Sequence, residues 1–251
     1  MRGRRVGVPR VFPMTTVPKT TADPRFSRQR VSPILLVLLA IGGAWVLTRW
    51  WLYPALDIPD YAPMILRPIL GFAMAWWLIA RAGERWCDYG LRRPVSWWRL
   101  LVQCALLYAA VALSSRFVVP LLAQTFGATA SPSVLSSIGG NEAALLAWLA
   151  VAWSVGGFIE ELLFRGFLLN RIEAFLDKRA GGTVAAATAV LAQAALFGAL
   201  HLYQGSFGFV FAGLFALIYG AAYRLFGRNL WPLILVHGTW NSFAIWGAYA
   251  G

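Results

Sequence analysis

The sequence predicts an all-α protein: a polytopic bundle of about seven transmembrane helices with its amino end in the cytoplasm. Composition is the first indication, since 59% of the 251 residues are hydrophobic and only 13% are charged, which leaves too little polar surface for a soluble fold. Apolar stretches near the roughly 20 residues that a helix needs to cross hydrocarbon are the second indication. The third is that basic residues occur in every second connection between these stretches.

Seven apolar stretches account for most of the chain after residue 32. They lie at 33–56, 63–80, 100–124, 143–170, 183–203, 207–226 and 229–250. Residues 1–31 are rich in Pro, Thr and Arg and poor in apolar side chains, which is typical of a disordered segment. We therefore expect a disordered basic cytoplasmic tail at 1–31, amino-terminal membrane helices at 32–142 and a second group of membrane helices at 143–251.

Basic residues predict the orientation of these spans, because Lys and Arg in short connections favour the cytoplasmic side. After the basic tail, the connections predicted to lie inside hold Arg81, Arg85, Arg92, Arg93, Arg99, Arg165, Arg171, Lys178, Arg179, Arg224 and Arg228. The connections predicted to lie outside, 57–62, 125–142 and 204–206, hold no Lys or Arg. Seven spans satisfy this alternation and leave the carboxyl end outside. Arg49, Arg67 and Arg116 fall within or near spans.

The formal net charge of +12 indicates a membrane partner and no nucleic acid. Polybasic segments beside a bilayer attract anionic lipid, and no nucleic-acid recognition motif accompanies the charge. We expect a multi-pass protein of the cell's inner (plasma) membrane, with anionic lipid at its basic cytoplasmic segments. Short outer connections and basic inner ones favour substrate access from the cytoplasm or laterally from lipid.

Four ionisable side chains within the apolar stretches are the first candidate functional residues. They are the adjacent acids Glu160 and Glu161 and the chain's two histidines, His201 and His237. An ionisable group in the middle of the bilayer costs at least about 2.5 kcal/mol, so such groups usually pair with one another or line a wet cavity. Their presence here indicates a buried hydrolytic centre.

The two acids need different partners, because adjacent residues point about 100° apart around a helix. Arg165 is four residues after Glu161 and shares its face, so we expect an ion pair between them. Glu160 is then free to face a small wet pocket and act as a general base. Phe197 and His201 are also four residues apart and share a face of the fifth span.

His237 and Asn241 share a face of the seventh span in the same way. Three helices can therefore bring a Glu, two His and an Asn together, which is the set needed to deprotonate a water and stabilise an oxyanion at a carbonyl. The same set can bind a divalent metal through imidazole nitrogen and carboxylate oxygen. Residue types alone leave both chemistries open.

The three motifs together resemble the CPBP family of intramembrane proteases, the CAAX-processing and bacteriocin-processing group also called the ABI family. In this chain they read Glu160-Glu161-x-x-x-Arg165, Phe197-x-x-x-His201 and His237-x-x-x-Asn241. Each motif alone is weak, whereas all three in this order on successive apolar stretches are specific. The resemblance covers roughly residues 143–250 and implies that 143–251 form a catalytic transmembrane core.

The resemblance implies an intramembrane endopeptidase that hydrolyses a peptide bond of a membrane-tethered peptide or protein, in CAAX-like or bacteriocin-type processing. It implies that Glu160 and His201 activate the water. It also implies that His237 and Asn241 stabilise the tetrahedral intermediate.

The resemblance further implies structural supports and a cofactor. The implied supports are Glu161, Arg165 and Phe197. The implied cofactor is a divalent metal such as zinc, and its candidate ligands are His201, His237 and Glu160. A glutamate-based mechanism without a metal is the alternative within the family.

Two other functions are compatible with the same residues. A non-enzymatic immunity or scaffold protein would keep the protease fold and bind a partner or peptide. A transporter or proton relay also uses intramembrane acids, but the chain shows neither an inverted repeat nor paired Gly/Pro-broken helices in its two halves. We therefore favour the protease.

The depths at which the candidate residues lie in the membrane lead to one further prediction. At 1.5 Å per residue, His201 is about 27 Å from the inner end of its predicted span, whereas Glu160 and His237 are on the order of 16 and 12 Å from theirs. The three can meet if the fifth span begins nearer residue 190, after a partly interfacial stretch at 180–189.

Overall fold

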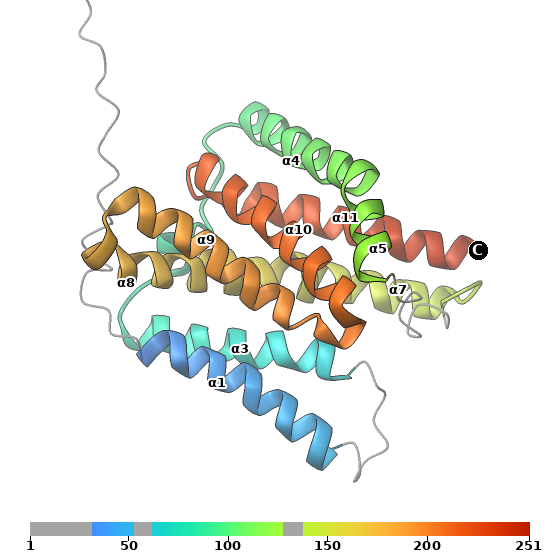
Figure 1. The fold of residues 1–251 in the computed structure, drawn as a ribbon, viewed down its shortest axis with the longest axis horizontal. Helices are drawn as coiled ribbons and strands as arrows, with labels where there is room; N and C mark the ends of the chain where they lie inside the picture. The colour runs from blue at the N-terminus through green and yellow to red at the C-terminus, as the bar shows by residue number, and fades with distance from the viewer. Residues whose placement is uncertain (1–31, 53–61, 128–137) are drawn as a thin grey trace, which may run out of the picture.

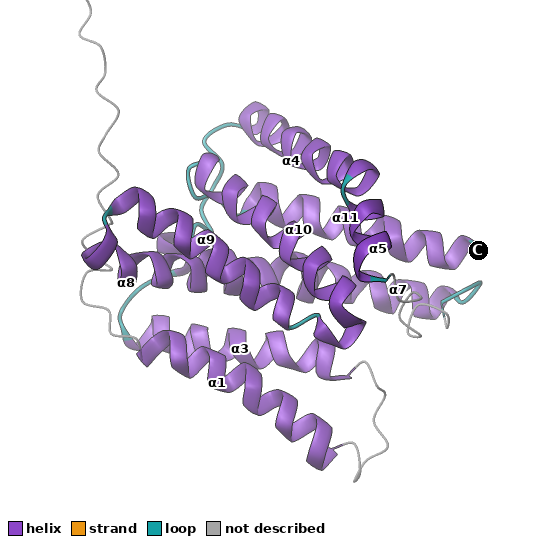
Figure 2. Ribbon diagram, in the orientation of Figure 1, coloured by secondary structure: helices purple, strands orange, loops and turns teal. Residues whose placement is uncertain are grey.

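The computed structural model describes residues 32–52, 62–127 and 138–251, and every secondary-structure element within them is helical (Figure 1 and Figure 2). The elements are α1 (Ser32–Val46), η2 (Leu47–Leu52), α3 (Ala62–Arg81), η3 (Trp86–Tyr89), α4 (Trp97–Phe117), α5 (Val119–Phe126), α7 (Glu142–Val151), η4 (Ala152–Glu160), η5 (Leu162–Leu169), α8 (Asn170–Ala180), α9 (Gly182–Ala199), η6 (Leu202–Gln204), α10 (Gly205–Leu225) and α11 (Trp231–Ala250). The predicted all-α class is confirmed. The predicted tail, 1–31, lies outside the described residues.

Five helices of the described part of the chain are long and apolar enough to cross a membrane: Met64–Arg81, Trp97–Phe117, Glu142–Asp177, Gly182–Ala199 and Leu202–Leu225. They correspond to the second to sixth predicted spans. The first corresponds to a shorter apolar helix, Pro33–Val46. The seventh corresponds to α11, a 20-residue helix in which His237, Asn241 and Ser242 lower the hydropathy. The chain is an integral membrane protein, and the count of seven spans stays a prediction.

The continuous segment from α7 to α8 lies at the centre of the bundle (Figure 1). Its middle part, η4 and η5, is π-helical, and residues 161–170 are all buried. The elements α3, α9, α10 and α11 all pack against η4 or η5. A helix that is covered on every side belongs to the interior of a bundle, and it offers fixed positions for polar side chains. The amino-terminal and carboxyl-terminal helices therefore share one core, and the domain division at 142/143 stays a prediction.

The third predicted span, 100–124, is divided in the structure. The helix α4 ends at Phe117, α5 begins at Val119, and Pro120 lies in the first turn of α5. Proline lacks an amide hydrogen and clashes with the carbonyl four residues before it, so it ends one helix and is tolerated at the start of the next. As a result α5 packs on α10.

The fifth helix begins at Gly182, so the start expected near residue 190 was wrong. Residues 183–190 are helical because their alanines pack in the core as Ala185, Ala186 and Ala189. Glu160 and His201 nevertheless lie at the same depth, for another reason. The fourth helix continues through α8 to Ala180, and the chain turns at Gly181, whose φ is +76°. Glu160 lies 21 residues before Gly181 and His201 lies 20 residues after it, so the two face each other across an antiparallel pair of helices.

Candidate active site

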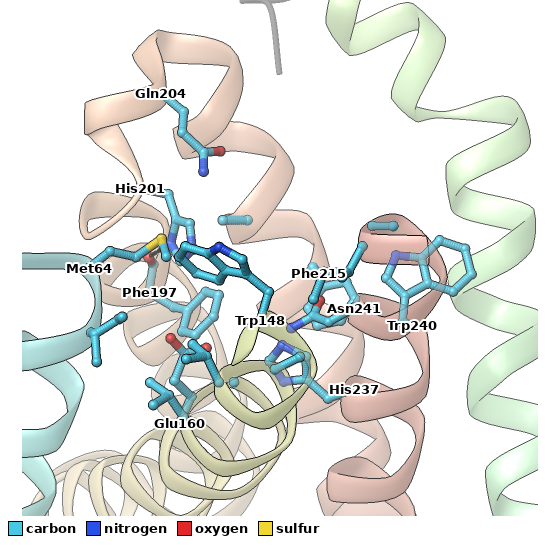
Figure 3. A pocket seen from close by; sticks show the side chains of 18 of the residues that line it. Met64, Trp148, Glu160, Phe197, His201, Gln204, Phe215, His237, Trp240 and Asn241 are labelled. Atoms are coloured by element: carbon cyan, nitrogen blue, oxygen red, sulfur yellow. Dashed lines mark hydrogen bonds between the residues drawn. The ribbon is translucent and has the colours of Figure 1, made fainter. Parts of the chain in front are cut away.

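A pocket of about 300 Å³ lies among α3, α7, η4, α9, α10 and α11, and the four predicted catalytic residues line it. Figure 3 shows Glu160, His201, His237 and Asn241 around this space. Most of the remaining lining is apolar or aromatic and includes Met64, Ile65, Trp148, Phe197, Phe211, Phe215 and Trp240. The structure thus brings together the four predicted catalytic residues, the first and last of which, Glu160 and Asn241, are 81 positions apart in the sequence.

The two adjacent acids lie in different surroundings. Glu160, at the end of η4, is half-buried and faces the pocket (Figure 3). Glu161 is fully buried outside the pocket lining, and its Oε1 accepts a hydrogen bond from Arg165 Nη1 at 3.0 Å. The same oxygen lies 2.8 Å from His237 Nδ1. The expected ion pair is therefore present. Glu161 also binds His237, a contact that the sequence did not predict.

Arg165 is fully buried between two aromatic rings. Its guanidinium carbon lies 4.8 Å from the ring centroid of Phe197 and 5.3 Å from that of Tyr219. A desolvated guanidinium over an aromatic face gains about 2 kcal/mol. Because Phe197 is on α9 and Tyr219 is on α10, Arg165 connects η5 to both helices directly beside the pocket.

His201 follows the end of α9, and Phe197 holds it in two ways. The two rings are tilted against each other with centroids 4.8 Å apart. Nδ1 of His201 lies 2.9 Å from the Phe197 carbonyl oxygen. A carbonyl oxygen only accepts, so Nδ1 carries the hydrogen of the bond, and Nε2 of the neutral ring is left as a proton acceptor.

The register between the fourth helix and α11 determines the depth of His237. Glu161 and Asn170 are nine residues apart, as are Arg228 and His237. Arg228 Nη1 donates to Asn170 Oδ1 at 2.7 Å, and His237 Nδ1 donates to Glu161 Oε1 at 2.8 Å. Two contacts with equal spacing on both segments hold the helices in one antiparallel register.

Two glycines allow α11 to lie unusually close to η4. A Cβ atom on Gly157 would lie 3.1 Å from the carbonyl oxygen of Ile234. A Cβ atom on Gly156 would lie 2.7 Å from Asn241 Nδ2 and 3.7 Å from His237 Nε2. The amide nitrogen of Asn241 and Nε2 of His237 therefore face the same small space beside Gly156, which also lines the pocket.

The described residues contain no group of three or more His, Cys, Asp or Glu side chains with the geometry to hold a metal ion. His201, His237 and Glu160 share the pocket but do not form such a group as they stand. Nδ1 of His201 bonds to the Phe197 carbonyl oxygen and Nδ1 of His237 bonds to Glu161, so Nε2 is the one nitrogen that each ring could offer to a metal. The residues present do not fit a zinc centre, which requires at least three protein ligands, and the mechanism below routes no step through a metal.

Sequence reasoning missed three residues that shape the site: Gly156, Phe215 and Tyr219. The rings of Phe215 and Tyr219 lie 5.1 and 5.7 Å from that of His237. Their spacing of four on the sixth span was a usable signal, but aromatic pairs at that spacing are usual in any helix core. The Gly156-Gly157 pair was a second signal, because small residues mark close helix contacts in membranes.

Comparison with known families gives a match to the carboxyl-terminal part of the chain. Residues 142–243 match the family described as type II CAAX prenyl endopeptidase Rce1-like. The match begins at the first residue of α7 and includes all three motifs. The resemblance to CAAX-processing proteases is thereby confirmed. No curated protein and no solved structure matches the chain.

Proposed function

We propose that this chain, whose residues 142–243 match the Rce1-like CAAX endopeptidase family, is an intramembrane endopeptidase that uses Glu160 and His201 to activate water. The observation that carries the proposal is that one pocket within a membrane bundle is lined by the carboxylate of Glu160, the imidazoles of His201 and His237 and the amide of Asn241. Such a set supplies a general base and oxyanion donors at one point.

The first step is attack by water on the scissile carbonyl. Glu160 takes one proton of the water, and His201 Nε2 accepts a hydrogen bond from the other, because its Nδ1 is already engaged by the Phe197 carbonyl. The hydroxide oxygen then bonds to the carbonyl carbon. A positioned general base of this kind contributes about 10²–10⁴-fold to the rate.

In the second step the tetrahedral intermediate is stabilised and then breaks down. Asn241 Nδ2 and Nε2 of His237 face the same space and donate to the oxyanion. For His237 to donate through Nε2 while Nδ1 donates to Glu161, its ring must be protonated, and the Glu161 carboxylate stabilises that imidazolium. The carbon–nitrogen bond then breaks, and Glu160 returns its proton to the leaving amine.

The proposed substrate is a membrane-tethered peptide or protein, cleaved in CAAX-like or bacteriocin-type processing. The match to a CAAX endopeptidase family and the apolar pocket lining support this class. The alternative is a membrane immunity or scaffold protein that keeps the protease fold and binds the same peptide without cutting it.

An assay with purified protein in proteoliposomes distinguishes the protease from the protein that binds the peptide without cutting it. Wild type and Glu160→Gln are incubated with a library of acylated peptides that carry large apolar residues, and new amino termini are identified by mass spectrometry. A protease generates termini that increase with time for the wild type alone. Peptides that are retained by both proteins and stay intact would establish the binding protein instead.

Metal removal tests the cofactor prediction. We expect dialysis against 1,10-phenanthroline and EDTA to leave cleavage unchanged, because His201, His237 and Glu160 do not form a three-ligand group. Elemental analysis of the purified protein provides a readout that does not depend on activity. Stoichiometric zinc, together with activity that is lost on chelation and restored by zinc, would contradict this expectation.

Gly156→Ala is expected to lower kcat without unfolding the protein. The added methyl group would lie 2.7 Å from Asn241 Nδ2 and push the amide away from the oxyanion. The loss should approach the roughly 10²–10³-fold cost of removing one oxyanion donor. Gly247→Ala on α11 is the matched control, because no atom lies within 4 Å of its added methyl group. Equal kcat values for the two variants would show that Asn241 does not act at the reacting carbonyl.

A further inference from the structure

A second cavity, of about 300 Å³, lies between the loop that precedes α4 and the turn from α10 to α11. In Figure 1 the start of α4 and this turn lie close together toward the upper left. In the part of the chain that the structure describes, the cavity shares no lining residue with the candidate active site. Its polar lining includes Arg92, Arg93, Ser96, Arg99, Gln103 and Asn229.

Hydrogen bonds hold the two walls of this cavity together. Arg92 Nη2 donates to the carbonyl of Gly227, and Asn229 Nδ2 donates to the carbonyl of Arg92 at 3.4 Å. The amide of Leu230 donates to the carbonyl of Gly90 at 3.0 Å. Because these bonds join the loop to the turn, the cavity is part of the fold, and its arginines are held near one another.

The charge of the cavity is positive without compensation. Among the described residues that line it there are three arginines and no acid. Arg92, Arg93 and Arg99 form no ion pair with any acid of the described residues. Other arginines do bond to carboxylates: Arg171 to Glu84, and Arg224 and Arg228 to Glu173. Since like charges repel, three guanidinium groups around one cavity favour a bound anion.

From this arrangement we infer that the second cavity binds a phosphate group, carried by an anionic phospholipid or by a soluble phosphate ester. The planar fork of a guanidinium group matches two phosphate oxygens at once. The 21-residue helix α4 also begins at the cavity, where the Ser96 hydroxyl accepts a hydrogen bond from the Arg99 amide at 3.1 Å. The other amides of a first helical turn have no acceptor within the helix and favour an anion.

The surroundings of the cavity favour the lipid as the source of the phosphate. Three apolar side chains beside the arginines are exposed: Val95 to 86%, Trp97 to 77% and Trp98 to 75%. Trp97 is also the first residue of a helix that is long and apolar enough to cross a membrane. Tryptophans at the ends of spans lie at the level of the lipid headgroups, so the three arginines are expected at the depth of lipid phosphate. The anionic lipid expected at the basic segments is thereby narrowed to one site.

Native mass spectrometry of the full chain in a neutral detergent tests the site without any need for activity. The protein is titrated with dioleoylphosphatidylglycerol, with dioleoylphosphatidylcholine and with glycerol 3-phosphate. The test variant is Arg93→Gln/Arg99→Gln, whose two side chains are exposed, so that the fold should be kept. The matched control is Arg81→Gln/Arg85→Gln, which removes two exposed arginines of the same connection outside the cavity. Thermal midpoints without ligand verify that both variants are folded.

We expect the wild type and the control to bind a single phosphatidylglycerol with equal affinity, and the test variant to bind it about 30-fold more weakly. Phosphatidylcholine should bind weakly to all three proteins. If glycerol 3-phosphate binds as tightly as phosphatidylglycerol and is lost in the test variant, the phosphate site stands and its ligand is a soluble ester. Equal binding to all three proteins, or equal weakening in the two variants, would overturn the inference. If the test variant unfolds, Arg99→Gln against Arg85→Gln makes the same comparison.

Discussion

Glu160→Gln is expected to lower kcat by about 10²–10⁴-fold, the usual contribution of a positioned general base, while KM and the thermal midpoint stay unchanged. The amide keeps the size and hydrogen-bonding capacity of the carboxyl group but cannot accept the proton of the attacking water. Steady-state kinetics on the peptide identified with the wild type measure the effect. Thermal unfolding in the same detergent verifies that the variant is folded.

Glu142→Gln is the matched control for this prediction. Glu142 is the first residue of α7, is exposed and lies on the same continuous helical segment as Glu160, outside the pocket. It should keep wild-type kcat. If Glu160→Gln were as active as Glu142→Gln, then Glu160 would not be the base, and the assignment of its role would fail.

Arg165→Met should destabilise the protein by about 3–5 kcal/mol, the cost of leaving one partner of a buried ion pair uncompensated. Glu161 has no exposed surface, and Arg165 donates to it at 3.0 Å. The substitution also removes the guanidinium from between the rings of Phe197 and Tyr219. Chemical or thermal unfolding in detergent measures the loss of stability.

The double variant Glu161→Gln/Arg165→Met separates stability from chemistry. The second substitution removes the buried charge that Arg165→Met leaves uncompensated, so most of the stability should return. Activity should stay low, because His237 Nδ1 no longer donates to a carboxylate and the imidazolium loses its counter-ion. Recovery of full activity in the double variant would contradict the role of Glu161 in holding His237.

Composition and motif spacing were sufficient to predict the helical fold and four polar residues that line the pocket, Glu160, His201, His237 and Asn241. Apolar length predicts membrane helices because hydrocarbon allows few alternatives. Spacings of four residues correctly placed Glu161 with Arg165 and Phe197 with His201. The catalytic roles of Glu160, His201, His237 and Asn241 stay predictions until the variants are measured.

Other features depend on contacts between residues far apart in the chain, which the spacing of residues along the sequence does not reveal. The bond from His237 to Glu161 requires the antiparallel register that Arg228 and Asn170 help to hold, and neither residue belongs to a motif. The start of the fifth helix was wrong because the length of the fourth was underestimated: the polar residues of α8 continue the helix beyond the apolar stretch. Hydropathy detects the end of the apolar stretch, whereas backbone hydrogen bonds determine the end of the helix.

The most direct test of proteolysis is a comparison of membrane-proteome peptides from a deletion strain that carries either the wild type or Glu160→Gln at matched expression. We predict peptide termini that occur only with the wild type, all derived from membrane-associated proteins. Those termini would identify the substrate and the cleaved bond together. Identical peptide profiles for the two strains, with any phenotype rescued equally by Glu160→Gln, would contradict the protease and establish a binding or immunity function.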